Sequence, residues 1–464
     1  MPKPAKPGAR PTAGGLPLAA RIDAAARLLD RIAADPRPAD AVIAAFLREM
    51  PALAGSDRGS VLDLADNVLH RRAALDWWIA RTGHGLPADG RSRLIVYLAL
   101  VEGRKPDAIE RAFAKVGPAP ALGGREQSLV AGLAGKSLLQ AEMPLAARCS
   151  FPAWLEADLR RAFGSALEVE MQALATPAPL DFRVNSLKAS RAETRAALAK
   201  ERLQAQPTPL SPIGLRLPRG IDLGQCRALQ DGLVEPQDEG SQIAALLVDA
   251  RPGQFVVDYC AGAGGKTLAL AAMMQNHGRL IAADVSAGRL ERAKLRLRRA
   301  GVHNAECRDS GERKWFKRQA GRADRVLVDA PCTGIGSWRR IPDARWRLQP
   351  TDLPELLQRQ REILDAAAVL VRPGGRLIYV TCSVLPQENE EQVAQFIGRH
   401  PDFAPLPVAD LWPQVIEAPC PAAGPWLQLT PARHGTGGFF VAILERRTAL
   451  QPEGGDSQRD PAGQ

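Results

Sequence analysis

The sequence has no uninterrupted apolar run long enough to span a bilayer, so no membrane-spanning segment is expected. Its first residues, MPKPAKPGARPTAGG, lack the apolar stretch of a secretory signal and have little of the amphipathic character of an organellar transit peptide. They predict a disordered leader over 1–16. The polar residues 448–464 likewise predict a disordered tail.

Cys-x-x-Cys pairs are also absent. The seven cysteines are odd in number and scattered along the chain, which argues against a disulfide framework and against a zinc site. We therefore expect no bound metal and a reducing, cytoplasmic location. A cysteine that has a function in such a protein acts as a thiolate.

Acidic residues are outnumbered by basic ones, 51 to 61, which gives a formal charge of +10 and favours a polyanionic partner such as nucleic acid. The excess is concentrated in 286–322, with twelve Lys and Arg against four Asp and Glu, and Trp315 and Phe316 among them. A second stretch, 337–347, interleaves Trp338 and Trp346 with four arginines. Arginines that bind phosphates beside aromatic faces that stack on bases are typical of RNA binding. A solvated helix face explains 286–299 equally well.

The length of 464 residues predicts two or three domains. Residues 17–140 have the apolar spacing of an all-helical domain. A looser segment rich in Ala and Pro then leads into a small α+β unit, and the two together cover 141–235. In that unit Ser190 and Glu193 have the spacing of a helix-capping box.

Strands and helices alternate from 236 to 447. The strands are expected over 254–259, 279–285, 324–331 and 376–383, and the last one, over 438–447, is expected at an edge of the sheet. This alternation predicts an α/β domain of the Rossmann-like type, with a doubly wound, mainly parallel sheet. Ligands of such sheets bind at the carboxyl ends of the strands.

A glycine-rich loop, 260–266, joins the first of these strands to a helix. It is not a P-loop, because Cys260 stands where that motif needs glycine and because Asp258 would repel a triphosphate. A ligand without phosphates, such as S-adenosylmethionine, fits better. Asp284 is placed for ribose hydroxyls and Asp309 for an adenine amino group, although each alone is typical of a cap or turn.

Two cysteines follow predicted strands, Cys332 in Asp-Ala-Pro-Cys and Cys382 in Thr-Cys-Ser. Carbon 5 of a pyrimidine becomes nucleophilic only after addition at carbon 6, and a thiolate both adds well and leaves again. An acid such as Asp329 would stabilise the charge that develops on the ring. Either cysteine alone could be a buried structural residue. Their shared place at strand ends favours catalysis.

These motifs resemble the cytosine-5 RNA methyltransferase family. The resemblance lies in VVDYCAGAGGKT, ADVSAGRLER, RVLVDAPCTGIGSWRR and VRPGGRLIYVTCSVLPQENE, and it extends from FRVNSLK through GLVEPQDEGSQ to GFFVAILER. It covers roughly 150–447, with the motifs in the family's order. It implies a monomeric enzyme that methylates carbon 5 of cytosine with S-adenosylmethionine.

The resemblance also implies roles for individual residues. In the family, the cysteine of the Thr-Cys motif attacks the base and that of the Pro-Cys motif assists release, which makes Cys382 the nucleophile and Cys332 the release residue. DNA cytosine methyltransferases use the Pro-Cys cysteine as nucleophile instead. Lys266 and Asp329 are expected at the catalytic site. The implied cofactor contacts are Cys260, Ala261, Gly262, Ala263, Gly264, Gly265, Lys266, Asp284, Arg289, Asp309 and Asp329.

The chain departs from the family pattern at two places. Where the family has an Ala-Pro-Gly-Gly-Lys loop, this chain has Ala261-Gly-Ala-Gly-Gly-Lys266. One more glycine replaces the rigid proline region, which predicts a more flexible loop. Before the last strand, the family's Asp-Gly pair is Gly437-Gly438. Neither departure changes a cysteine.

The helical stretch 55–79 resembles the NusB-like RNA-binding domain, which is joined to the bacterial enzymes that methylate 16S ribosomal RNA. The resemblance therefore implies 16S ribosomal RNA as substrate. The same chemistry on transfer RNA stays open, as does a non-enzymatic RNA-binding factor of ribosome assembly. Methylation of a glutamine or an exocyclic amine is not expected, because that chemistry uses Asn/Asp-Pro-Pro-aromatic where this chain has Asp-Ala-Pro-Cys.

Overall fold

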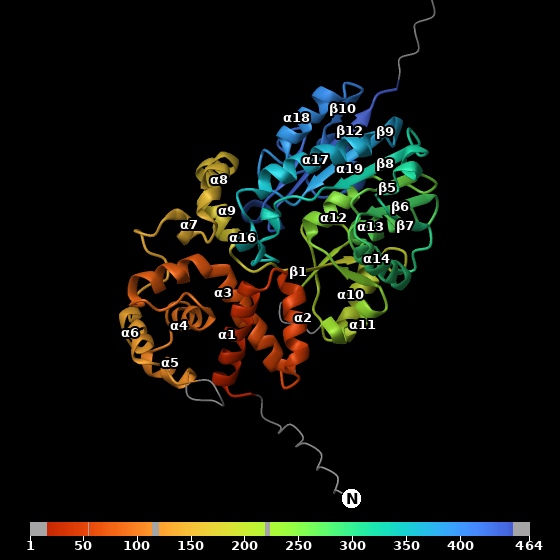
Figure 1. The fold of residues 1–464 in the computed structure, drawn as a ribbon. Helices are drawn as coiled ribbons and strands as arrows, with labels where there is room; N and C mark the ends of the chain where they lie inside the picture. Colours follow the sequence, from red (N-terminus) through yellow and green to blue (C-terminus); the bar gives the residue numbers. More distant parts are fainter. Residues whose placement is uncertain (1–15, 54, 114–119, 219–222, 449–464) are drawn as a thin grey trace, which may run out of the picture. The chain divides into compact units, whose positions relative to one another are not determined.

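The computed structural model describes residues 16–53, 55–113, 120–218 and 223–448. The expected disordered leader and tail lie outside these residues except for one residue each. The chain forms two compact units (Figure 1). The first contains the described residues up to Pro177 together with Trp338–Leu348, and the second contains Ala178–Ser337 and the described residues from Gln349 onward. No helix in the described ranges is both long enough and apolar enough to cross a bilayer.

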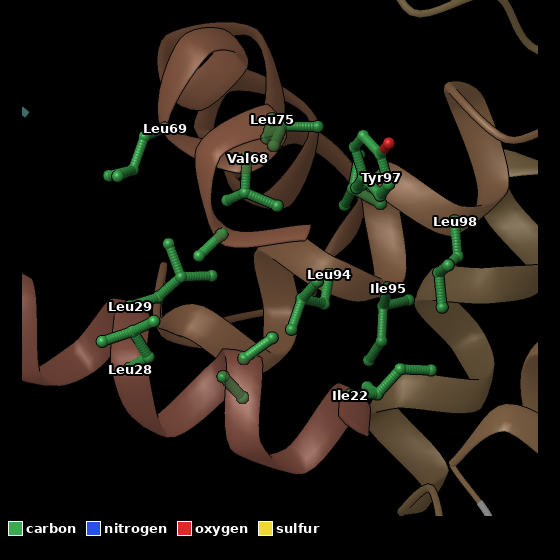
Figure 2. Packing of buried hydrophobic residues seen from close by; sticks show 14 of the residues in the cluster. Ile22, Leu28, Leu29, Val68, Leu69, Leu75, Leu94, Ile95, Tyr97 and Leu98 are labelled. Atoms are coloured by element: carbon green, nitrogen blue, oxygen red, sulfur yellow. The ribbon is translucent and has the colours of Figure 1, made fainter. Parts of the chain in front are cut away.

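The first unit is helical, as predicted. Its helices are α1 (Leu18–Ala34), α2 (Ala39–Glu49), α3 (Gly55–Thr82), α4 (Gly90–Leu100), α5 (Pro106–Ala112) and α6 (Gly124–Leu133). Helix α4 lies at the centre of their core, since Leu94, Ile95 and Leu98 are fully buried against residues of α1 and α3 (Figure 2). Gly90 allows α1 and α4 to approach closely, because a Cβ there would lie 2.3 Å from the Ala26 carbonyl oxygen.

The expectation of a loose segment after residue 140 is wrong for much of its length. Short helices α7 (Leu145–Arg148), α8 (Glu156–Phe163) and α9 (Leu167–Leu174) form there. Gly164 separates α8 from α9 with a φ of +53°, a conformation that favours glycine. Each of these helices is too short for its apolar residues to repeat at helical spacing over a recognisable length of sequence, so the sequence did not predict them.

The segment Trp338–Leu348, which contains helix α16 (Ala344–Arg347), packs with the first unit although its sequence neighbours belong to the second. Trp338 and Arg345 are fully buried. Arg345 donates to the carbonyl oxygens of Ser150, Leu174 and Trp338 at 2.8–3.3 Å, and its guanidinium lies 5.1 Å from the Trp338 ring centre. The prediction that Trp338 stacks on bases is therefore wrong, because this tryptophan is a core residue.

The second unit begins with a small antiparallel sheet in the order β2-β3-β1-β4. Its elements are β1 (Leu180–Val184), α10 (Arg191–Lys200), β2 (Gln206–Pro207), β3 (Gly214–Leu217), α11 (Arg227–Gln230) and β4 (Val234–Pro236). The capping box predicted for α10 is confirmed: the Glu193 amide donates to Ser190 Oγ, and Glu193 Oε2 accepts from the Ser190 amide. Phe182, Leu198 and Leu215 form the buried centre of this sheet.

A larger, mainly parallel sheet follows, in the order β10-β12-β9-β8-β5-β6-β7, with β11 paired to β12. Its strands are β5 (Phe255–Asp258), β6 (Arg279–Asp284), β7 (Ala305–Asp309), β8 (Ala323–Asp329), β9 (Val371–Thr381), β10 (Phe403–Leu406), β11 (Leu427–Leu429) and β12 (Phe439–Arg446). The pairs among β5 to β9 are parallel, and those of β10 and β12 are antiparallel. The Rossmann-like fold is thus confirmed.

Helices cover both faces of this sheet. Ile378 and its neighbours on one face pack with α12 (Glu239–Leu246), α13 (Gly265–Met273) and α19 (Val408–Val415). Tyr379 and the other residues whose side chains point to the opposite face of the sheet pack with α15 (Arg313–Lys317), α17 (Asp352–Ala368) and α18 (Glu390–Arg399). Helix α14 (Ala287–Ala300) packs beside α13 and β7, and α20 (Pro431–His434) precedes β12. Successive side chains of a strand point to opposite faces of the sheet, so each strand contributes residues to the cores on both faces.

The prediction that the last strand is an edge strand is wrong. Strand β12 lies between β9 and β10, and β11 also pairs with it. Its residues Phe439–Leu444 are all buried, and such an apolar strand requires cover on both sides. The strands at the two ends of the sheet are β10 and β7.

The buried Arg345 leads to a prediction about stability. Replacing it by leucine leaves three buried carbonyl oxygens without a donor, and we expect the free energy of unfolding to fall by about 3 kcal/mol. Chemical denaturation followed by circular dichroism measures the change. The exposed Arg125 of α6 is the control in the same unit, and Arg125→Leu should change stability by less than about 0.5 kcal/mol. Equal effects of the two substitutions would contradict a role for Arg345 in the core.

Candidate active site

Four carboxylates lie at the carboxyl ends of parallel strands. Asp258, Asp284, Asp309 and Asp329 are the last residues of β5, β6, β7 and β8. Asp284 is directly opposite Asp309 in the ladder of β6 and β7. Because the strands are parallel, these ends meet at one edge of the sheet, where a ligand is expected.

The glycine-rich loop is fixed to this edge by backbone hydrogen bonds. The Ala261 amide donates to the Ala283 carbonyl oxygen, and the Gly262 amide donates to Asp284 Oδ2, both at 2.9 Å. Gly262 and Gly264 have φ values of +56° and +80°, so both positions favour glycine. The loop then turns directly into α13.

An arginine contacts the loop where the family has proline. Arg296 Nη1 donates to the Ala263 carbonyl oxygen at 2.7 Å, and Arg296 Nη2 pairs with Glu235 at 3.1 Å. Glu235 is buried and also pairs with Arg299. Two cations of the basic helix α14 are therefore committed to contacts within the protein, whereas Arg289, Arg292 and Arg298 are exposed.

Asp258 is fully buried behind the loop. Its Oδ2 accepts a hydrogen bond from Thr267 Oγ1 at 2.7 Å, while its Oδ1 is buried without a hydrogen-bond partner among the described residues. Burial raises the pKa of this carboxyl to about 7; the Thr267 hydrogen bond opposes the rise and the charge of Asp329 adds to it. An unpartnered buried carboxylate oxygen fits a ligand that brings a cation or a donor.

Lys266 and Asp329 form an ion pair in the site. Lys266 is buried, and its Nζ donates to Asp329 Oδ2 at 2.6 Å. Burial alone would lower the pKa of Lys266, but the charge and hydrogen bond of Asp329 outweigh it and the pKa is raised. The ammonium also interacts electrostatically with Cys382 and lies 5.5 Å from the ring centre of Phe439. Lys266 therefore remains a cation.

Cys332 and Cys382 meet although fifty residues separate them. Their sulfur atoms are 3.5 Å apart, and both residues are partly exposed. The Gly336 amide donates to the Cys382 carbonyl oxygen at 2.9 Å, and the Gly438 amide donates to the Gly336 carbonyl oxygen at 2.8 Å. A Cβ on Gly336 would lie 2.1 Å from the Gly438 carbonyl oxygen, so this contact requires the absence of a side chain.

The two sulfurs differ in their surroundings. The pKa of Cys332 is raised well above 9, first by its hydrogen bond with Cys382, then by burial, and further by the charges of Cys382 and Glu388. Cys332 therefore keeps its proton to a higher pH than an ordinary thiol does. Cys382 is the member near the Lys266 ammonium.

The structure gathers most, but not all, of the predicted residues. The loop 260–266, Asp284, Asp329 and both cysteines lie at one edge of the sheet. Asp309 belongs to the same row of strand ends, but its side chain is exposed and accepts from the Gly311 amide. Arg289 is exposed on α14, where its charge opposes the rise that burial causes in the pKa of Cys260.

Sequence reasoning missed several contacts of the site. Arg296 was counted only as one charge in a basic stretch. Glu388 and Gln360 were not considered, although Glu388 lies in the QENE run six residues after Cys382. The signal that the sequence offered for Glu388 was an acidic residue shortly after a candidate catalytic cysteine. Among the described residues, no group of three or more His, Cys, Asp or Glu side chains is arranged to hold a metal ion.

Comparisons with known proteins identify similar sequences over most of the chain. Residues 245–445 match the family described as 16S rRNA methyltransferase RsmB/F, and residues 151–224 match its ferredoxin-like domain. A ribosomal RNA small subunit methyltransferase B from Pectobacterium carotovorum is 30% identical over 84% of this chain and 90% of its own. A probable enzyme of the same name from Synechocystis is 33% identical over 67% of this chain and 70% of its own.

A solved structure agrees with this similarity. A methyltransferase homologue from Pyrococcus horikoshii is 28% identical and superposes with a TM-score of 0.57. It covers 66% of this chain and 100% of its own length.

The raised pKa of Asp258 predicts how stability depends on pH. The folded pKa of about 7 exceeds the ordinary value of 3.8, so the proton on Asp258 stabilises the fold fully below about pH 3.8, and this contribution is lost as the pH rises through 7. We expect wild type to lose about 2–3 kcal/mol relative to Asp258→Asn between pH 5 and pH 8. Urea denaturation of both proteins across this range measures the difference. A constant difference from pH 5 to pH 8 would show that Asp258 titrates normally.

Proposed function

The chain belongs to the 16S rRNA methyltransferase RsmB/F family, and from that premise we propose that it methylates carbon 5 of one cytosine in 16S ribosomal RNA through a covalent adduct with Cys382. Its general activity follows from the family: it is a methyltransferase of ribosomal RNA that uses S-adenosylmethionine. The observation that carries the finer proposal is the 3.5 Å separation of the Cys332 and Cys382 sulfurs beside the Lys266–Asp329 pair.

The residues at the loop fit the cofactor. S-adenosylmethionine supplies an electrophilic methyl group on a sulfonium, and it is a nucleoside whose amino-acid end carries an ammonium and a carboxylate. The unpartnered Asp258 Oδ1 suits a cation or donor, and Asp284 at the end of β6 suits ribose hydroxyls. Gly262 and Gly264 let a ligand approach the backbone. Asp309 and Arg289 are exposed and are proposed only as outer contacts.

Cys382 begins the reaction. Its thiolate attacks carbon 6 of the cytosine, a carbon–sulfur bond forms, and the electron pair of the 5,6 double bond moves into the ring. Carbon 5 thereby becomes the nucleophile that accepts the methyl group. A cation beside the attacking sulfur is typical of nucleophilic cysteines, and Lys266 supplies it.

Asp329 and Lys266 act together on the base. The Lys266 ammonium donates to Asp329 Oδ2 and fixes the orientation of this carboxyl. We assign Asp329 to the ring nitrogen, where negative charge develops during the attack. To stabilise this charge, the Asp329 oxygen that does not face Lys266 must carry a proton and donate it in a hydrogen bond to the ring nitrogen. The ion pair with Lys266 holds the Asp329 carboxyl in one orientation, whereas a carboxylate free on the surface would be mobile.

Cys332 ends the reaction. As a thiolate it removes the proton from carbon 5, the electron pair of that bond restores the double bond, and the bond between carbon 6 and Cys382 breaks. Attack by Cys382 prepares this step, because the bonded Cys382 sulfur carries no charge and accepts only a weak hydrogen bond. One cause of the raised pKa of Cys332 then disappears and another weakens, and its proton is released to solvent.

Two other functions remain open. The same chemistry on transfer RNA would use all of these residues, and only the substrate distinguishes it. A ribosome-assembly factor without catalytic activity would need the fold but not the two adjacent sulfurs. The NusB-like role of the helical unit, its RNA binding and a monomeric, cytoplasmic protein also stay proposals.

We expect Cys382→Ala to abolish methyl transfer from labelled S-adenosylmethionine to unmodified ribosomal RNA, with a loss of at least about 10³-fold. Cys332→Ala should retain attack but not release, and so should accumulate a protein–RNA complex that survives denaturing electrophoresis. Bisulfite sequencing of the wild-type product should show one protected cytosine in small-subunit RNA.

Three outcomes separate the candidate functions. Transfer to transfer RNA alone would keep the chemistry and change the substrate. A complex trapped by Cys382→Ala rather than Cys332→Ala would exchange the roles of the two cysteines. No transfer to either RNA, with RNA binding retained, would support the assembly factor.

A further inference from the structure

Glu388 is a fully buried carboxylate in the turn before α18. Its Oε1 accepts from the Thr333 amide at 2.8 Å and from Gln360 Nε2 at 2.9 Å. Its Oε2 accepts from Thr333 Oγ1 at 2.5 Å and from Ser383 Oγ. A carboxylate is costly to bury unless such donors compensate it.

The donors to Glu388 flank the two cysteines. Thr333 directly follows Cys332, and Ser383 directly follows Cys382. The hydroxyl oxygens of Thr333 and Ser383 are 3.2 Å apart. The two segments therefore approach each other at these residues as closely as they do at the two sulfurs, which are 3.5 Å apart. One carboxylate therefore binds both catalytic segments through adjacent residues.

Two further side chains, those of Gln360 and Tyr379, hold Glu388 in place near the Cys332 segment. Gln360 of α17, which donates to Glu388, also donates to the Pro331 carbonyl oxygen at 3.0 Å. Tyr379 of β9 donates its hydroxyl to the Glu388 backbone carbonyl oxygen at 2.7 Å. Glu388 is thus held by a strand and a helix as well as by the two segments.

We propose that Glu388 is a positioning residue for both cysteines: it fixes the distance between their sulfurs, and its negative charge makes Cys332 a stronger base for the release step. The second part rests on the proposed function, in which Cys332 removes the proton from carbon 5. The first part is independent of which nucleic acid is the substrate.

The charged and titratable groups around Cys332 support a role for this charge. The Cys332 sulfur contacts the Cys382 sulfur and interacts electrostatically with Glu388 and Tyr379, while a hydrogen bond from the Gly334 backbone opposes the rise in its pKa. Lys266 interacts electrostatically with Cys382 and pairs with Asp329. The Glu388 charge raises the pKa of Cys332, and it persists after Cys382 has bonded to the base. A more basic thiolate removes a proton faster.

The test measures Cys332 without requiring methyl transfer. In a Cys382→Ala background, the rate of Cys332 alkylation by iodoacetamide is followed against pH by mass spectrometry of its peptide. We expect Glu388→Gln to lower the midpoint of this profile by about one pH unit, because a negative charge near the thiolate is removed. An unchanged midpoint in folded Glu388→Gln would overturn the electrostatic part of the proposal.

A matched control separates this effect from loss of packing. Gln392 is a buried amide in the first turn of α18. It donates to the Leu357 carbonyl oxygen and to Gln360 Oε1, and among the described residues it makes no hydrogen bond to the segments that follow Cys332 and Cys382. Gln392→Ala should leave the midpoint unchanged. A shift as large as that of Glu388→Gln would reveal a general structural effect and overturn the proposal.

Turnover tests the positioning part. Glu388→Asp retains the charge but is one methylene shorter, and we expect it to keep the midpoint while lowering kcat at least about tenfold with little change in KM. Should Glu388→Gln not fold, Thr333→Val and Ser383→Ala each remove one hydroxyl donor and leave the carboxylate. Both should lower kcat, and full activity in both would overturn the positioning role. Inactive wild-type protein with the expected alkylation shift would refute the proposed function but not the role of Glu388.

Discussion

The parallel pairing of β8 with β9 is the constraint on which the site depends. Asp329 lies opposite Val380 in this ladder, so the segments that follow the two strands leave the sheet at the same edge. Cys332 is three residues beyond Asp329 and Cys382 two beyond Val380, and their sulfurs meet at 3.5 Å. A register slip of one residue would turn alternate side chains to the opposite face and separate the thiols. The buried residues on both faces of β9 oppose such a slip.

Carboxylates line this edge, and the partners that compensate the negative charge differ from one carboxylate to the next. Asp329 has a lysine, Asp284 has the amides of Gly262 and Ser286, and Glu388 has four donors from the protein. Asp258 alone keeps one buried oxygen without a partner among the described residues. Asp258 Oδ1 is thus the buried carboxylate oxygen at this edge to which the described residues offer no donor.

The sequence predicts the fold class, the glycine-rich loop and the two cysteines because each depends on local patterns. Apolar strands that alternate with helices identify a parallel sheet, and a parallel sheet brings its carboxyl ends together. Strand order is not local, which is why β12 was misplaced at an edge. The burial of Trp338 and the contact of Arg296 with Ala263 also depend on partners far away in the chain. Glu388 escaped notice for the same reason, since its donors come from three separate segments.

The interior position of β12 has a consequence for synthesis on the ribosome. A chain that emerges from its amino terminus can form the helices before residue 177 early, but β9 remains an open sheet edge until residues 439–446 appear. The first unit is also incomplete until Trp338–Leu348 has been made, because the buried Arg345 donates to the carbonyl oxygens of Ser150 and Leu174 in that unit. A nascent chain halted before residue 439 would therefore carry both cysteine segments and yet lack the strand whose preceding Gly438 contacts Gly336. Such a truncated product would expose an unpaired apolar strand, and cellular quality control would meet it as an aggregation-prone fragment rather than as a less active enzyme.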